Sequence, residues 1–184
     1  MPERADAARN RRAILRAAED LFARNGPDHV SMEQVASAAG VGKGTVFHRF
    51  TSREGLIRAL VEDRVQALQD SLTSAPPPLG PGAPPRDRLI AFLDATIELA
   101  TKNIALIAAY DQSTSDRQAS PTYQLWHAHV RTLIAEARPE LDAELLAYIL
   151  LSSLHSDLIV HLLRNGQSER LTKSLRDLVG NLLR

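Results

Sequence analysis

Apolar residues recur every three or four positions along most of the chain, and this spacing predicts an all-α protein. One helix is predicted from Arg9 to Asn25, where a single stripe holds the apolar side chains Ile14, Leu15, Ala18, Leu21 and Phe22. Gly26 and Pro27 follow the stripe and end the predicted helix.

Two short helices joined by a tight turn are predicted in the next stretch, SMEQVASAAGVGKGTVFHRF, from Ser31 to Phe50. Ser31 and Gln34 have the spacing of a capping box, in which the side chain of each residue bonds the backbone N–H of the other. Gly40 suits the left-handed position after the first helix. Gly42 is expected to cap the second helix, from Lys43 to about Arg49.

The second short helix has two unlike faces. Val46, Phe47 and Phe50 are expected to anchor it to the rest of the domain. Its other face holds cationic, hydrogen-bonding or very small residues: Lys43, Gly44, Thr45, His48 and Arg49. A helix that is anchored to its domain on one side and polar on the other suits the major groove of DNA. We therefore interpret the segment as a helix-turn-helix. An ordinary helical hairpin is the alternative that this turn alone leaves open.

The segment from Ile14 to Leu60 resembles the N-terminal domain of the tetracycline-repressor (TetR) family of bacterial transcription regulators. The matching stretches are ILRAAEDLFARNG, SMEQVASAAGVGKGTVFHRF and SREGLIRAL. Phe47 stands where the family commonly has tyrosine, so a hydroxyl-to-phosphate bond is not available there. Gly42 stands where serine or threonine is frequent, which weakens the cap by a few tenths of a kcal/mol.

The resemblance implies a three-helix helix-turn-helix DNA-binding domain over residues 1–55 and a helical ligand-binding and dimerisation domain over residues 56–184. It implies a transcription regulator, most simply a repressor that a small apolar effector releases from a palindromic operator in double-stranded DNA. Neither a cofactor nor a bound metal is expected. The residues expected to contact DNA are Ser31, Lys43, Gly44, Thr45, Phe47, His48 and Arg53.

The position of Arg53 in the first turn of a predicted helix is a separate reason to expect a phosphate contact. Thr51 and Glu54 have the spacing of a second capping box, which opens a helix reaching to about Leu72. A cation in the first turn of a helix is disfavoured by the helix dipole. Arg53 therefore makes better sense if it meets a phosphate, although a solvated arginine is the alternative.

Proline-rich residues 75–85 separate this helix from the rest of the chain and are expected to form a loop. Further helices are predicted from about Arg86 to Lys102, as a short stretch from Ile104 to Tyr110, and, after the polar loop 111–120, from Pro121 to about Ala137. Ser120 and Pro121 form a cap and first-turn pair for the last of these.

Two helices are expected to close the chain, from about Asp142 to Arg164 and from Ser168 onward. The first is apolar nearly all round, so it must be buried on several sides or lie in a membrane. His155, Asp157 and His161 argue against a membrane. The simplest remaining account is that one side of the helix faces its own domain and the other faces a second copy of the protein. The predicted dimer interface comprises Ser152, Ser153, Ser156, Val160, Leu175, Leu178 and Leu182.

Aromatic residues after the linker fall on the helices that enclose an effector cavity in the resembled family. The candidate pocket residues are Phe92, Tyr110, Tyr123, Trp126 and His155. Plain core packing is the alternative for each of them, because a helical protein buries such side chains in any case.

Composition narrows the possible functions. The 184 residues include no cysteine, which excludes disulfides and thiolate metal sites and is consistent with the cytoplasm. The N-terminus has no apolar signal-peptide core. The net charge is +0, yet the first 16 residues carry five arginines against two acids. This basic arm suits phosphate contacts, or it is a solvated, frayed end.

Two other classes of function remain open. A helical metal-binding protein or enzyme would use His155, Asp157 and His161, although these residues point to different sides of a helix. A protein-interaction module would use the helical hairpin and the proline-rich loop.

Overall fold

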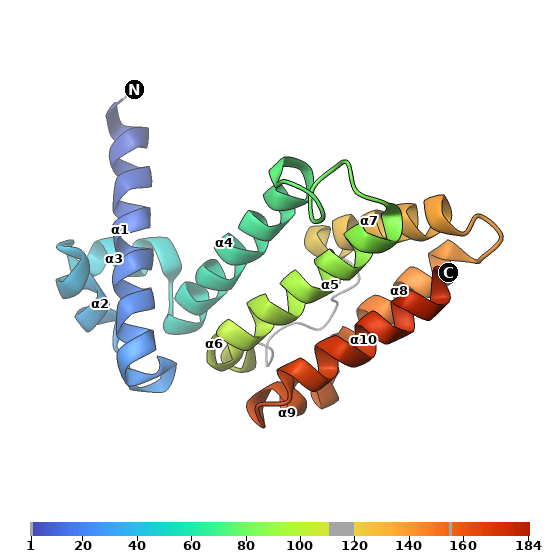
Figure 1. The fold of residues 1–184 in the computed structure, drawn as a ribbon. Helices are drawn as coiled ribbons and strands as arrows, with labels where there is room; N and C mark the ends of the chain where they lie inside the picture. The colour runs from blue at the N-terminus through green and yellow to red at the C-terminus, as the bar shows by residue number, and fades with distance from the viewer. Residues whose placement is uncertain (1, 111–119, 155) are drawn as a thin grey trace. The chain divides into compact units, whose positions relative to one another are not determined.

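The computed structural model describes residues 2–110, 120–154 and 156–184, with side chains left undescribed at residues 2–5 and 108–110. The described residues form helices and no strand, so the predicted all-α class is confirmed (Figure 1). In chain order the elements are α1 (Pro2–Asn25), the short 3₁₀ helix η1 (Pro27–His29), α2 (Met32–Ala39), α3 (Lys43–Phe50), α4 (Arg53–Ser74), α5 (Pro85–Lys102), α6 (Ile104–Tyr110), α7 (Pro121–Ala137), α8 (Ala143–Leu154), α9 (Asp157–Arg164) and α10 (Ser168–Leu182).

The chain divides into two compact units. Within the described residues, unit 1 comprises residues 2–63 and 105–110, and unit 2 comprises residues 64–104, 120–154 and 156–184. This division differs from the expected domains 1–55 and 56–184 in two ways. Helix α4 contributes to both units, and part of α6 joins unit 1.

Unit 1 has one core, built on the predicted stripe of α1. Helix α1 packs against α2, and α2 packs against α3. Ile14, Ala18, Val35 and Val46 are among the side chains buried there. The core also contains Leu106 of α6, a contribution from far along the chain that the sequence pattern did not indicate.

Helix α1 begins at Pro2, so the predicted start near Arg9 was wrong. The basic N-terminal segment is therefore helical rather than a frayed end. Arg9 lies 3.3 Å from Asp6 within the helix. Arg11 makes a two-pronged bond to Asp63 of α4, with N–O distances of 3.1 and 2.9 Å. Such paired bonds fix orientation as well as adding energy, so Arg11 sets α1 against the first half of α4.

Unit 2 is a helical bundle in which α5 packs against α7 and α10, while α7 packs against α8. Its core includes the fully enclosed side chains of Phe92, Leu93, Leu133 and Leu151. The proline-rich residues 75–84 form turns, as predicted, and Leu79 from this segment packs on the core.

The predicted single helix from Asp142 to Arg164 was wrong, because the structure contains two helices there. Ser156 is extended, with φ −81° and ψ 152°, and its hydroxyl accepts from the Ile159 N–H at 3.4 Å. Serine at such a position competes with the helical backbone, and here it caps α9. Helices α8 and α9 are consequently bent by 44°.

Among the described residues, no single helix is both long and apolar enough to cross a membrane. The bent pair α8 and α9 reaches that length and composition together, as core helices of globular proteins also do.

Candidate functional site

The start of α2 is fixed by local bonds. The Ser31 hydroxyl accepts from the Gln34 N–H at 3.2 Å, and the Gln34 side chain accepts from the Ser31 N–H at 2.7 Å. The predicted capping box is therefore confirmed. Ser31 remains exposed, but its hydroxyl is engaged in this cap.

The turn between α2 and α3 is equally local. Gly40 ends α2 with φ 66° and ψ 30°, the left-handed conformation that glycine adopts without steric cost. The Val41 N–H then bonds the Ala36 carbonyl at 3.0 Å. Gly42 precedes α3 without a side-chain cap bond, as expected for glycine at this position.

Helix α3 is anchored by two residues rather than three. Val46 and Phe50, four residues apart, are 0% and 6% exposed. Phe47 is 37% exposed, so the prediction that it anchors the helix was wrong. A helix turns by about 100° per residue, which places Phe47 well away from the line through Val46 and Phe50. Its ring instead lies beneath Lys43, whose Nζ atom is 5.5 Å from the ring centre.

The rest of α3 faces solvent. Lys43, Gly44, Thr45, Phe47 and His48 are all exposed, so the predicted contact residues of this helix lie on the surface. Gly44 and His48 are four residues apart and point directly away from Val46. A side chain added at Gly44 would meet nothing within 4 Å, so this part of the helix presents bare backbone. Such a surface can approach a groove closely and offer hydrogen bonds and the cation of Lys43.

That cation has a partner in this structure. Lys43 forms an ion pair with Glu33 of α2, and both side chains are more than half exposed. The hydrogen bond from Lys43 is the main cause that lowers the pKa of the Glu33 carboxyl below its usual value. A phosphate approaching Lys43 must therefore compete with this carboxylate.

The junction of α3 and α4 differs from the predicted capping box. Thr51 ends α3 with φ 62° and ψ −47°, an uncommon conformation for a β-branched residue. Ser52 caps α4, since its hydroxyl accepts from the Gly55 N–H at 3.2 Å. Gly55 is required by the tightness of the junction, because a Cβ atom there would lie 2.1 Å from the Phe50 carbonyl oxygen.

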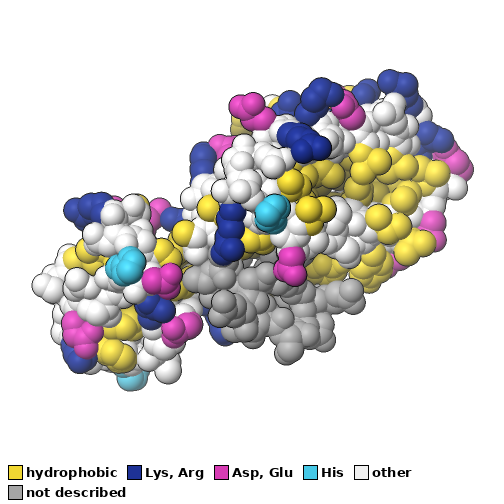
Figure 2. Space-filling model, turned by 90° about the horizontal axis from the view of Figure 1, so that it is seen from below, with side chains coloured by type: hydrophobic (Ala, Val, Ile, Leu, Met, Phe, Trp, Pro, Cys, Tyr) yellow, Lys and Arg dark blue, Asp and Glu magenta, His cyan; other side chains and the backbone are white. Residues whose placement is uncertain are grey.

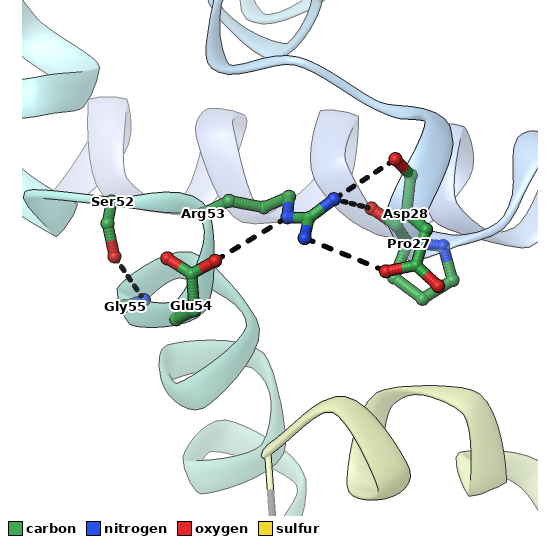
Figure 3. Close-up of polar contacts among 6 residues, drawn as sticks. All are labelled: Pro27, Asp28, Ser52, Arg53, Glu54 and Gly55. Carbon is green, nitrogen blue, oxygen red and sulfur yellow. Dashed lines mark hydrogen bonds and ion pairs between the residues drawn. The ribbon is translucent and has the colours of Figure 1, made fainter. Parts of the chain in front are cut away.

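Arg53 connects this junction to η1 (Figure 3). Its guanidinium donates to the Pro27 and Asp28 carbonyl oxygens at 3.2 and 3.0 Å, and lies 3.6 Å from the Asp28 carboxylate and 3.7 Å from that of Glu54. These acceptors explain a cation in the first turn of α4 without any phosphate. This geometry does not test the predicted DNA contact, but a phosphate is not needed to compensate the charge of Arg53.

The predicted pocket aromatics fall into two groups in unit 2. Phe92 meets Trp126 edge-to-face, with ring centres 5.4 Å apart. Tyr123 stacks on His127 and Tyr148, with ring centres 6.5 and 6.4 Å away. Phe92, Tyr123 and Trp126 are all buried. Tyr110 lies on α6 with an undescribed side chain, and His155 lies outside the described residues.

The predicted interface residues differ in their exposure to solvent. Ser152 and Ser153 are exposed, Ser156, Val160 and Leu182 are half-buried, and Leu178 is 53% exposed. Leu175 packs into the core of its own unit. The predicted interface set does not include Leu145, Tyr148 and Ile149, which are exposed on one face of α8. Figure 2 shows that hydrophobic side chains gather in a broad band on one face of unit 2.

The metal-binding alternative gains no support. Among the described residues, no group of three or more His, Asp or Glu side chains could hold a metal ion. Asp157 begins α9, and the ring of His161 contacts Asn165 near the end of that helix.

The fold and the exposed face of α3 define a helical protein with an N-terminal helix-turn-helix. Residues 14–60 match the family described as bacterial regulatory proteins, tetR family. This match identifies residues 14–60 as a DNA-binding domain of the kind found in that family of transcription regulators.

The relatives that match the chain are also described as HTH-type transcriptional regulators. An uncharacterized HTH-type transcriptional regulator of Mycobacterium tuberculosis is 32% identical over 95 residues, which cover 52% of this chain and 46% of the relative. The HTH-type transcriptional regulator UidR of Escherichia coli is 36% identical over 64 residues, covering 34% of this chain and 33% of UidR. The matched parts thus span half or less of these relatives.

Similarity to solved structures extends over nearly the whole chain. A TetR transcriptional regulator from Streptomyces coelicolor is 27% identical, with a TM-score of 0.57 and coverage of 95% of this chain and 98% of the other. A TetR-family transcriptional regulator from Pectobacterium atrosepticum has a TM-score of 0.70 at 20% identity, and the match covers 98% and 97% of the two chains. The second likeness concerns the fold alone.

Proposed function

We propose that this chain binds a specific DNA operator as a homodimer and regulates transcription, most simply as a repressor that a small apolar effector releases. The observation that carries the proposal is the surface of α3. The buried side chains of Val46 and Phe50 anchor the helix in the core of unit 1. The exposed residues of the helix include Lys43, Gly44, Thr45 and His48. A helix held in this way fits the major groove, with phosphate contacts setting its position and the exposed polar groups reading bases.

Ser31 and Arg53 remain candidate DNA contacts at the edges of this surface. Both already serve the fold, Ser31 as the α2 cap and Arg53 as the bridge to η1. We therefore assign them supporting roles, in which they hold α2 and α4 while α3 contacts DNA.

The dimer is proposed from the exposed apolar residues of unit 2. Leu145, Tyr148 and Ile149 share one face of α8, and Leu178 lies on α10. Large apolar side chains left in water favour burial against a second copy. A two-fold dimer requires a nearly palindromic operator, with half-sites one helical turn of DNA, about 34 Å, or a multiple of it apart.

The effector would act through α4. This helix has 22 residues, and its length is about 33 Å. It begins next to α3 in the sequence and ends within unit 2, so a tilt of its far end near Leu72 would move the junction at Arg53. An effector that favours the tilted state by about 1–3 kcal/mol would weaken operator binding roughly 5- to 150-fold.

Selection of bound DNA from a random pool tests the proposal. We expect a near-palindromic consensus, and Lys43→Ala should weaken binding to it and to unrelated DNA by similar factors. The slope of log K against log salt should flatten by about one, because one phosphate contact is lost. Lys173, which pairs with Asp177 on α10, is the matched control. A pool without enrichment, or equal effects of Lys43→Ala and Lys173→Ala, contradicts the proposal.

A further inference from the structure

Two enclosed polar atoms in unit 2 have no hydrogen-bond partner among the described residues. They are Nε of Arg88 on α5 and Nε2 of His129 on α7. The two helices pack against each other, and the Arg88 charge acts on His129. Both residues are half-buried overall, so this pair lies just beneath the surface of unit 2.

Arg88 is a half-buried cation on α5. Among the described residues, no carboxylate lies within ion-pair distance of it, and it makes one long hydrogen bond, 3.5 Å, to the Leu72 carbonyl. Two other half-buried arginines are paired with carboxylates, Arg11 with Asp63 and Arg53 with Asp28. An uncompensated cation that is partly out of water destabilises a fold, and an apolar side chain of similar size would fit more favourably.

His129 is uncharged beside this arginine. Burial is the main cause that lowers the pKa of its imidazole to about 4, and the Arg88 charge adds to the shift. A neutral imidazole can present Nε2 as an N–H donor. Arg88 and His129 therefore offer one positive charge and two neighbouring donors without an acceptor.

The surroundings of this pair are aromatic. The His129 ring lies against Phe92 with centres 5.4 Å apart, and Phe92 lies at the same distance from Trp126. A ligand whose charged group meets Arg88 and His129 would thus find apolar contacts for the rest of its body.

We propose that Arg88 and His129 form the recognition site for the carboxylate of an apolar carboxylic acid, with Arg88 supplying the charge and His129 a second hydrogen bond. One carboxylate carries the single negative charge that Arg88 lacks, and its two oxygens match two donors. A metal cation is repelled by the guanidinium. A phosphate dianion would require more cations than the described residues place here.

This inference rests on the proposed function in that the acid would be the effector, but its test does not depend on DNA. The full-length protein is titrated with octanoate, decanoate and phenylacetate, and with decanol and methyl decanoate as uncharged matches. Trp126 is the single tryptophan of the chain, so its fluorescence reports binding beside Phe92. Thermal unfolding measures the rise in Tm that each compound causes.

We expect at least one carboxylate to change the Trp126 fluorescence in a saturable way, while its uncharged match does so at least tenfold more weakly. Arg88→Met should abolish this binding and leave the Tm of the free protein equal or higher, because an uncompensated charge is removed. The exposed Arg86 of the same helix gives the matched control, Arg86→Met, which should bind normally. His129→Phe, which keeps an aromatic ring, should weaken binding roughly 10- to 100-fold.

Three results would overturn the site: no carboxylate binds, the uncharged matches bind equally well, or Arg88→Met binds normally. A fall in the Tm of free Arg88→Met with unchanged binding would assign Arg88 a structural role instead. Operator affinity is measured separately with and without the acid. Binding that depends on Arg88 but leaves operator affinity unchanged contradicts the effector mechanism and not the site.

Discussion

Arg53 has partners in the structure that its position in the sequence did not predict. A cation at the start of a helix is unfavourable, and a phosphate is one means of compensating it. The structure uses backbone carbonyls at Pro27 and Asp28 instead (Figure 3). Carbonyl groups carry no sequence signature, so this partner could not be recognised before the chain was folded.

A stability measurement distinguishes the two explanations of Arg53. Arg53→Ala should lower the free energy of unfolding in the absence of DNA by about 1–2 kcal/mol, because two charge-assisted hydrogen bonds are lost and the side chain is partly exposed. Urea unfolding followed by circular dichroism gives this value. Arg12→Ala, at an exposed site on α1, is the control. Unchanged stability with weakened DNA binding would restore the phosphate contact as its main role.

At the scale of elements, the sequence was most informative where the determinants are local. The Ser31–Gln34 capping box and the left-handed Gly40 each depend on neighbours within a few residues, and both were predicted correctly. Ser120 likewise caps α7 as expected. The α8–α9 break was missed because leucines continue at helical spacing across it, and one serine at position 156 is a weaker signal than that spacing.

If α3 contacts DNA as proposed, Gly44 favours close approach to DNA at the expense of helix stability. Gly44→Ala should stabilise the folded protein by up to about 1 kcal/mol, since alanine is the better helix former and its Cβ would meet nothing within 4 Å. The same methyl group would stand between the helix backbone and the groove, so binding to the selected operator should weaken. Thermal unfolding and operator titration are measured on one preparation. Higher stability with unchanged operator affinity would show that Gly44 does not approach DNA.

Positions of side chains at the surface were harder to predict than the elements that carry them. Phe47 was expected to anchor α3 together with Val46 and Phe50, and also to contact DNA, yet α3 turns it outward beside Lys43. Leu175 and Leu178 were grouped together, although one faces the core and the other solvent. Composition cannot separate such neighbours, because the rotation of a helix is set by what it packs against.

At the scale of the whole molecule, the proposed dimer makes a direct prediction. Ile149 is 55% exposed on α8, so Ile149→Lys should leave the fold of one chain intact and place a charge in the interface. An unpaired buried charge costs several kcal/mol, and the dimer should dissociate. Ile149 is a better choice than Ser156, whose replacement would also remove the α9 cap.

Analytical ultracentrifugation measures the result, with Ala23→Lys at an exposed site on α1 as the control. Wild type and the control should sediment as dimers and Ile149→Lys as a monomer with unchanged helical content. A dimeric Ile149→Lys protein would locate the interface elsewhere.

The presence of Leu106 in the core of unit 1 affects how this chain could be recombined with related sequences. In a chimera that exchanges residues 1–63 alone, the rest of unit 1 would lose its own Leu106. A side chain that fits poorly at this position would lower the free energy of unfolding by roughly 2–5 kcal/mol. The transferable module is discontinuous, and it requires residues 105–110 from the same parent. Crossovers between homologous sequences should therefore yield folded hybrids more often when residues 1–63 and 105–110 come from the same parent.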